Sequence, residues 1–214
     1  MDEDISIINT STRNEKIKNF FVNNKKNLII IFSLIFILII SYFSYNELKK
    51  RNKIKLATLY NSIVIDYELK NKKKTIKELT FLINEKDNTY SPLALYFIID
   101  KELIDNKDDV NDLFNIIIDK TNLELEIKNL VIYKKALYNS DIIDENDLIN
   151  ILNPIINSDS VWKSHALYLI AEYFYSNNQK IKSKEFFKKI MTLSNINEDI
   201  KILTQKRLNR DLRE

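Results

Sequence analysis

The sequence predicts an all-α protein, in which a single transmembrane helix near the N-terminus is followed by a solenoid of about eight to nine short antiparallel helices. Two observations predict this fold class. Residues 28–45 contain no charged side chain and no Asn or Gln. From residue 56 onward, apolar residues recur at intervals of three and four, which is the spacing of one helix face, and no run shows sustained two-residue alternation.

Residues 1–27 precede the apolar segment, and we expect them to form a cytoplasmic tail with a short amphipathic helix. Their first part is polar and shows no strong periodicity. Further on, Ile17, Phe20 and Phe21 fall on one helical face with lysines around them, a pattern typical of a helix in the membrane interface. A plain helical extension of the span, without a role of its own, accounts for the same pattern.

Residues 28–45 form the expected transmembrane helix. At about 1.5 Å per residue this helix is about 27 Å long, which is close to the hydrocarbon thickness of a bilayer. A cleaved signal peptide is the main alternative, but its apolar core usually has about 7 to 15 residues and ends in a small-residue cleavage motif. Here the apolar run is longer and ends Ser-Tyr-Phe-Ser-Tyr. We therefore predict an uncleaved signal anchor that contacts membrane lipid.

The basic residues beside the span do not favour either orientation. Five precede it, at Arg13, Lys16, Lys18, Lys25 and Lys26, and five follow it, at Lys49, Lys50, Arg51, Lys53 and Lys55. A short basic tail before a first span tends to stay in the cytoplasm, and long domains can be translocated regardless of charge. We therefore expect a cytoplasmic N-terminus and export of residues 46–214.

Residues 46–214 are expected to form one helical-repeat domain, because about 160 residues suffice for a compact core. We expect helix N-caps at Ser91, at Asp108 or Asp109, at Asp144 and at Ser160. The chain has no Gly, so we expect Asn to end helices in the left-handed conformation, at Asn106, Asn139 and Asn178. Pro154 is expected to end or kink its helix.

The clearest repeat lies at residues 164–197, which have the length of one tetratricopeptide unit of two antiparallel helices. Small residues at Ala171 and Ser183 would let the two helices approach closely. The other matching positions are Leu167, Ile170, Phe174, Asn178 at the turn, Phe187 and Asn195. Earlier pairs near 91–121 and 123–157 share the helix length and phase but not the signature. The predicted fold is therefore a tetratricopeptide-like α-solenoid.

The composition excludes most catalytic machinery. Without Gly or Cys, the chain has no Gly-rich phosphate loop, thiol nucleophile or Cys-ligated zinc, and His165 is the only imidazole. We therefore expect no cofactor, metal, small-molecule substrate or enzymatic activity. The net charge of +3 is small and charges of both signs are interspersed, so we expect no nucleic-acid binding. A carboxylate-based hydrolase is the remaining enzymatic alternative, with pairs at Asp108 and Asp109 or Asp141 and Asp144, although such pairs more often cap helices.

The overall layout resembles the YfgM-like family, the ancillary subunits of the bacterial Sec translocon. The resemblance lies in the acidic start, the segment 17–25 before the single span, Asn88-Thr-Tyr-Ser-Pro-Leu-Ala94, Trp162 and the segment 178–187. The chain departs from the family where Asn, Ile and Lys replace Gly and Ala. The resemblance implies a single-pass protein of the bacterial inner membrane with its C-terminal domain in the periplasm. It implies as partners the Sec translocon channel and a periplasmic membrane-anchored chaperone.

Aromatic side chains on the first helix of each pair are the candidate partner-binding residues, because such rings give contact area at low conformational cost. We select Tyr96, Tyr133, Trp162, Tyr168 and Tyr175. Core packing explains aromatic residues at this spacing equally simply. The expected function is a membrane-anchored binding protein, either an ancillary translocon subunit and chaperone partner for exported proteins or a generic scaffold for envelope or organelle assembly that faces either side.

Overall fold

The computed structural model describes residue 13 and residues 15–67 and 72–212. All regular structure within these ranges is helical, with no strand, so the all-α prediction is confirmed for them. The chain divides into two compact units, Met1–Lys55 and Leu56–Glu214. The polar start of the expected cytoplasmic tail, residues 1–12, lies outside the described residues.

The first unit consists of helical residues 15–23 and most of α2, Lys25–Ile65. Ile17, Phe20 and Phe21 of the expected amphipathic helix are exposed, and the two Phe rings lie edge to face at 5.9 Å. Helix α2 is long and apolar enough to cross a membrane, and none of its most apolar stretch is buried. It continues as helix beyond Tyr45, so the expected span is only part of a longer helical segment.

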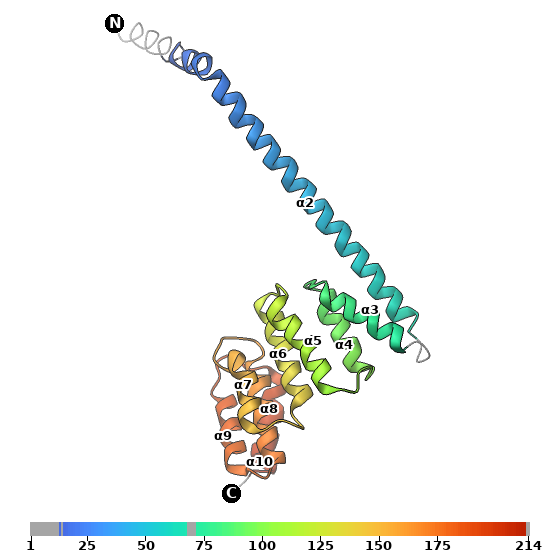
Figure 1. The fold of residues 1–214 in the computed structure, drawn as a ribbon. Helices are drawn as coiled ribbons and strands as arrows, with labels where there is room; N and C mark the ends of the chain where they lie inside the picture. The colour runs from blue at the N-terminus through green and yellow to red at the C-terminus, as the bar shows by residue number, and fades with distance from the viewer. Residues whose placement is uncertain (1–12, 14, 68–71, 213–214) are drawn as a thin grey trace, which may run out of the picture. The chain divides into compact units, whose positions relative to one another are not determined.

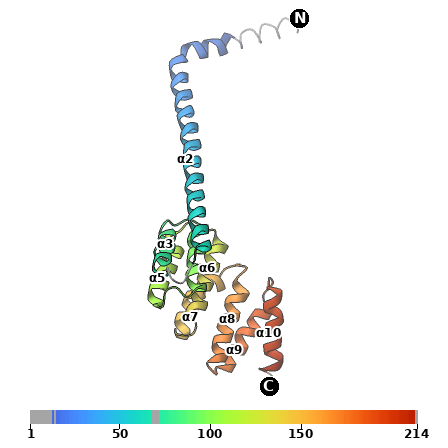
Figure 2. The same cartoon turned by 90° about the vertical axis from the view of Figure 1, so that its right-hand side faces the viewer.

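The second unit is built from short helices that follow one another in space as they do in sequence (Figure 1). After the last turns of α2 come α3 Lys72–Asn84, α4 Tyr90–Asp100, α5 Lys107–Lys120, α6 Leu125–Asn139, α7 Glu145–Ile156, α8 Lys163–Ser176, α9 Lys180–Met191 and α10 Glu198–Arg210. Each helix contacts the next from α3 onward, and α3–α5, α6–α8 and α8–α10 also touch. Figure 2 shows α8, α9 and α10 side by side.

Three apolar clusters hold this unit together, and their members are the residues with the three- and four-residue spacing. The first joins α3, α4 and α5 around the fully buried Phe114. The second joins α6, α7 and α8 around Leu152 and Phe174. The third joins α8, α9 and α10 around Phe187. Because each cluster is shared by consecutive helices, no single pair could bury its apolar face alone.

The α8–α9 hairpin contains the predicted tetratricopeptide positions. Leu167, Ile170, Ala171, Phe174, Ser183 and Phe187 are all buried. The small Ser183 is fully buried in α9, as close helix packing requires. Asn178, between the helices, has a φ of 59°, so its predicted left-handed conformation is confirmed.

Of the two other predicted helix terminators, one is wrong and one is right in position only. Asn106 has a φ of −76° and begins α5 instead, because its side chain accepts a hydrogen bond from the Asp108 amide at 2.9 Å. Asn139 is the last residue of α6, as expected, but its φ is not positive, and its buried side-chain amide exchanges hydrogen bonds of 2.8 and 2.9 Å with Asn111 of α5. The left-handed positions are Lys86 and Glu102 in addition to Asn178, so charged residues replace the missing Gly.

The predicted N-caps give a mixed result. Asp144 caps α7 by accepting from the Asp147 amide at 2.9 Å, as expected. Asp108 and Asp109 lie in the first turn of α5 and do not cap it. Ser91 lies inside α4, where its hydroxyl donates to the Leu82 carbonyl at 2.8 Å.

Two further helix boundaries were predicted at Ser160 and Pro154. Ser160 precedes α8 without being its N-cap, and its hydroxyl accepts from the Trp162 amide at 3.1 Å. Pro154 lies inside α7, which continues for two more residues to Ile156, so this proline does not end the helix.

Candidate functional site

An open hollow of about 500 Å³ lies between α4 and α6 in the second unit. Tyr60, from the part of α2 that belongs to this unit, closes one side of it. The hollow is lined by Tyr60, Leu93, Tyr96, Phe97, Ile99, Asp100, Lys134, Leu137 and Tyr138. Four of these residues are aromatic, so the wall consists largely of ring faces and edges. Such a surface suits an apolar side chain of a partner molecule.

Helix α4 forms this wall because it is apolar on more than one face. Its residues Ala94, Leu95 and Ile98 are buried in the first core cluster. Leu93 is nevertheless 37% exposed, although it is also apolar, and it faces the hollow. On α6, Leu137 is 49% exposed at the same place. Leu93 and Leu137 are therefore apolar residues that the core leaves accessible in the wall of this hollow.

Three lysines lie over the rings at this site. The Lys134 ammonium is 4.7 Å from the centroid of the Tyr96 ring. Lys107 of α5 lies 5.5 Å from the Tyr138 ring. Lys101 lies 6.0 Å from the ring of Phe97. A cation over an aromatic face is attracted by the ring quadrupole. Lys134 lines the hollow itself, whereas Lys107 and Lys101 lie over rings of its lining residues.

Tyr96 has a buried hydroxyl with no hydrogen-bond partner among the described residues. Burial raises the pKa of Tyr96 to about 12, so the hydroxyl stays protonated at neutral pH. A second hollow of about 320 Å³ shares Leu93 and Tyr96 with the first and includes Glu124 and Ile127 in its lining. The unpaired donor therefore belongs to a residue that lines both hollows.

Tyr133 and Trp162 lie together elsewhere, between α6 and α8. Their rings stack at 6.0 Å with an angle of 19° between the planes. His165 lies 5.1 Å from the Trp162 ring, and its Nδ1 is buried without a partner in the described part of the chain. Burial lowers the pKa of His165, while Asp199 acts in the opposite direction. This imidazole is therefore neutral at pH 7 and packs against rings.

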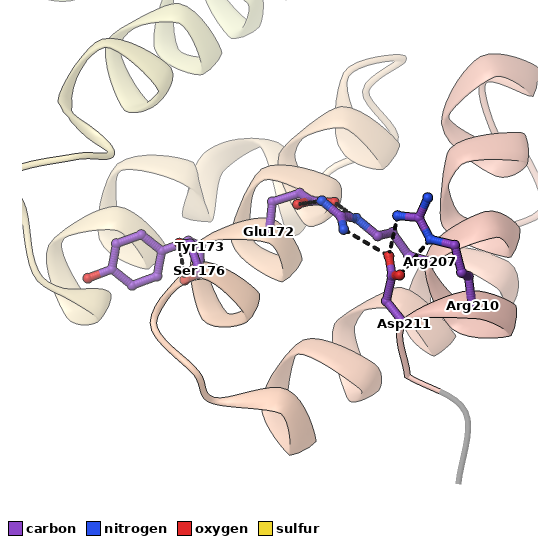
Figure 3. A network of polar contacts seen from close by, with 6 residues as sticks. All are labelled: Glu172, Tyr173, Ser176, Arg207, Arg210 and Asp211. Carbon is purple, nitrogen blue, oxygen red and sulfur yellow. Dashed lines mark hydrogen bonds and ion pairs between the residues drawn. The ribbon is translucent and has the colours of Figure 1, made fainter.

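Tyr168 and Tyr175 lie at a third place, where α8 meets α10. Figure 3 shows Arg207 of α10 between two carboxylates. Its Nε and Nη2 each donate to Glu172 at 2.7 Å, and its Nη1 donates to Asp211 at 2.9 Å. The guanidinium also lies 4.7 Å from the Tyr175 ring. Burial raises the pKa of Tyr168 to about 12, with smaller contributions from Glu172. These tyrosines take part in helix packing.

The five aromatic candidates thus occupy three separate helix interfaces, and among them Tyr96 lines the α4–α6 hollow. Sequence reasoning missed Lys134 and Lys107, because an isolated lysine carries no signal of the ring beneath it. It also missed the role of Leu93 and Leu137. The sequence did contain one indication of this site: α4 has more apolar residues than a single buried helix face needs, so some of them had to lie on an accessible surface.

The carboxylate pairs do not form a buried acid–base site. Asp108 and Asp109 are exposed in the first turn of α5, and Asp141 and Asp144 are exposed before α7. The Ser160 hydroxyl, close in sequence to His165, donates to the Glu126 carboxylate at 2.8 Å. Among the described residues, no group of three or more His, Asp or Glu side chains is placed to hold a metal ion.

No protein-family model matches this chain, and no curated protein or solved structure is significantly similar to it. The α4–α6 hollow is therefore interpreted from its own residues. Its half-buried rings and the lysine over one of them are suited to binding an apolar group.

Proposed function

We propose that this protein is a membrane-anchored helical-repeat binding module, without enzymatic activity, that holds apolar side chains of a partner protein in the α4–α6 hollow. The observation that carries the proposal is the aromatic lining of this hollow, with Tyr60, Tyr96, Phe97 and Tyr138 around an open space of about 500 Å³. Tyrosine and phenylalanine are the kind of anchors that dominate binding energy at protein interfaces, because they bury large areas with few rotatable bonds.

The membrane anchor explains how a hollow of this size can bind a partner with high occupancy. Residues 28–45 of α2 give one end of the chain an apolar rod long enough for a bilayer. A domain tethered beside its partner experiences an effective concentration in the millimolar range for short linkers, so modest affinity gives high occupancy. The binding partner is therefore itself at the membrane or passes through it.

A tetratricopeptide-like arrangement of the helices supports the same reading. In it, α4, α6 and α8 are the first helices of the pairs α4–α5, α6–α7 and α8–α9. The α8–α9 pair has the repeat residues at its interface, and helices two apart in sequence also touch at α6–α8 and α8–α10. First helices line the binding face of such solenoids. The α4–α6 hollow lies between two of them.

The finer proposal follows from the resemblance of the layout to the YfgM-like family. In it the protein is an ancillary subunit of the Sec translocon in the bacterial inner membrane, with a cytoplasmic N-terminus and a periplasmic domain. Its partners are the translocon channel and a periplasmic membrane-anchored chaperone. The alternative is a generic assembly scaffold that faces the cytoplasm, which the equal number of basic residues on both sides of the span permits.

Site-specific photo-crosslinking in native membranes tests the proposal. A photoreactive residue replaces Leu137, which is 49% exposed in the hollow, and the matched control replaces Ile202, which is 60% exposed on α10. Capture of a translocon channel subunit or a periplasmic chaperone from Leu137, identified by mass spectrometry and missing from Ile202, supports the finer proposal. Capture of a cytoplasmic assembly factor supports the scaffold alternative. The same products from both positions would contradict binding in the hollow.

A further inference from the structure

The charge around the α4–α6 hollow is uneven. Lys101 is neutralised by Asp100, whose carboxylate lies 2.9 Å from its ammonium group. Lys107 and Lys134 have no carboxylate within ion-pair distance in the described part of the chain, although both lie over rings of the hollow. Two uncompensated positive charges therefore stand beside a largely apolar space, where an opposite charge interacts more strongly than in open water.

The adjoining hollow has the opposite sign. It shares Leu93 and Tyr96 with the first hollow, and its lining includes Glu124, at the start of α6, but no lysine or arginine. The two hollows together thus run from a positive to a negative end, with Tyr96 common to both. An extended polypeptide can follow such a course over several residues, whereas a lipid headgroup would occupy one end of it.

We infer that the hollow selects an acidic and apolar peptide segment of a partner protein, with an apolar side chain among the rings and a neighbouring carboxylate beside Lys134 and Lys107. This inference rests on the proposed binding function. It adds the chemical class of the partner and the direction of the bound segment, whose uncharged or basic end lies toward Glu124. A carboxylate near either ring-bound ammonium group forms charge-assisted contacts that a neutral side chain cannot replace.

Fluorescence anisotropy with the full-length protein in zwitterionic lipid nanodiscs tests this inference. The probes are three labelled peptides with the same Phe-Leu core, flanked by Glu and Asp, by Gln and Asn, or by Lys. We expect the acidic peptide to bind about tenfold more tightly than the neutral one for each lysine engaged, and the basic peptide to bind least. Added salt should reduce the affinity of the acidic peptide selectively.

Variants assign the selectivity to particular residues. Lys134→Gln and Lys107→Gln should each remove most of the acidic preference, and the double variant Lys134→Glu with Lys107→Glu should invert it. Lys189→Glu, on the exposed side of α9, is the matched control and should change nothing. Tyr96→Phe should raise the unfolding temperature of the free protein and leave the acidic preference unchanged, because it removes an unpaired buried hydroxyl and no charge.

Each outcome separates the inference from the proposed function. Equal binding of the acidic and neutral peptides, or an acidic preference that survives the Lys134 and Lys107 substitutions, overturns the inference and leaves apolar binding in place. Binding of anionic vesicles that depends on these lysines, without binding of the acidic peptide, also overturns it. Failure of all three peptides together with failure of crosslinking from Leu137 overturns the proposed function itself.

Discussion

Ser183 offers a direct test of how α8 and α9 pack. Its side chain is fully buried, and its hydroxyl has no hydrogen-bond partner among the described residues. Removing an unsatisfied buried hydroxyl relieves a desolvation cost of about 1 kcal/mol, and Ala has a helix propensity about 0.5 kcal/mol better than Ser. The substitution Ser183→Ala is therefore expected to stabilise the protein by about 1.5 kcal/mol. For a domain of this size, that corresponds to a rise of about 3 to 6 °C in Tm.

The matched control is Ser91→Ala. Ser91 is also fully buried, but its hydroxyl donates to the Leu82 carbonyl at 2.8 Å. Removing this bond is expected to destabilise the protein by about 1 kcal/mol. Thermal unfolding of the full chain in detergent, followed by circular dichroism at 222 nm, measures both variants. The two serines should therefore change the unfolding temperature in opposite directions.

The opposite change in size tests the close approach of the helices. Ser183→Leu inserts a larger side chain between α8 and α9 and should cost about 1 to 3 kcal/mol through overpacking. A lower unfolding temperature for Ser183→Ala, or an unchanged one for Ser183→Leu, would refute the reasoning. Either result would mean that the hydroxyl has a partner in solution or that the helices stand further apart.

Three further predictions concern pH and the anchor. Burial lowers the pKa of His165 below 6.5, so the contribution of the neutral imidazole to stability is complete above pH 6.5 and is lost as the pH falls below that value. His165→Gln should abolish this pH dependence of the unfolding free energy, measured by fluorescence of the single tryptophan. Hydrogen bonds from Arg210 and then Arg207 hold the pKa of Asp211 well below its usual 3.8, so the stability of the protein should decline as the pH falls below 3.8. Asp211→Asn should reduce this decline, measured by unfolding curves between about pH 2 and pH 5. Ile35→Lys places a charge in the span at a cost of about 3 kcal/mol, and the protein should become extractable from membranes by carbonate.

The helices could be predicted from the sequence because the residues that a helix buries on one face recur at intervals of three and four. Leu167, Ile170, Ala171 and Phe174 of α8 recur at helical spacing, and the structure buries all of them. The turn at Asn178 was also predictable, because the left-handed conformation favours Asn when Gly is missing. These features depend on local geometry, which the sequence contains directly.

Tertiary pairing explains what the sequence could not predict. Asn139 ends α6, as expected, but not in the left-handed conformation. Its side-chain amide pairs with that of Asn111 on another helix, a contact that the sequence does not show. The hollow also depends on contacts between different helices. The Lys107 ammonium lies over the ring of the lining residue Tyr138 because α5 and α6 pack together. Such contacts join residues far apart in sequence and leave no pattern in it.

The most direct test of the account compares the anchor with the hollow. Crosslinking from Leu137 is measured in native membranes for three forms of the protein. The first is the natural chain, the second has residues 28–45 exchanged for an unrelated span of equal length, and the third is the natural chain with Lys134→Glu. The account predicts that the identified partner is captured with either span and is lost with Lys134→Glu, because the span tethers and the hollow binds. Loss of capture on exchanging the span, without any effect of Lys134→Glu, would contradict it.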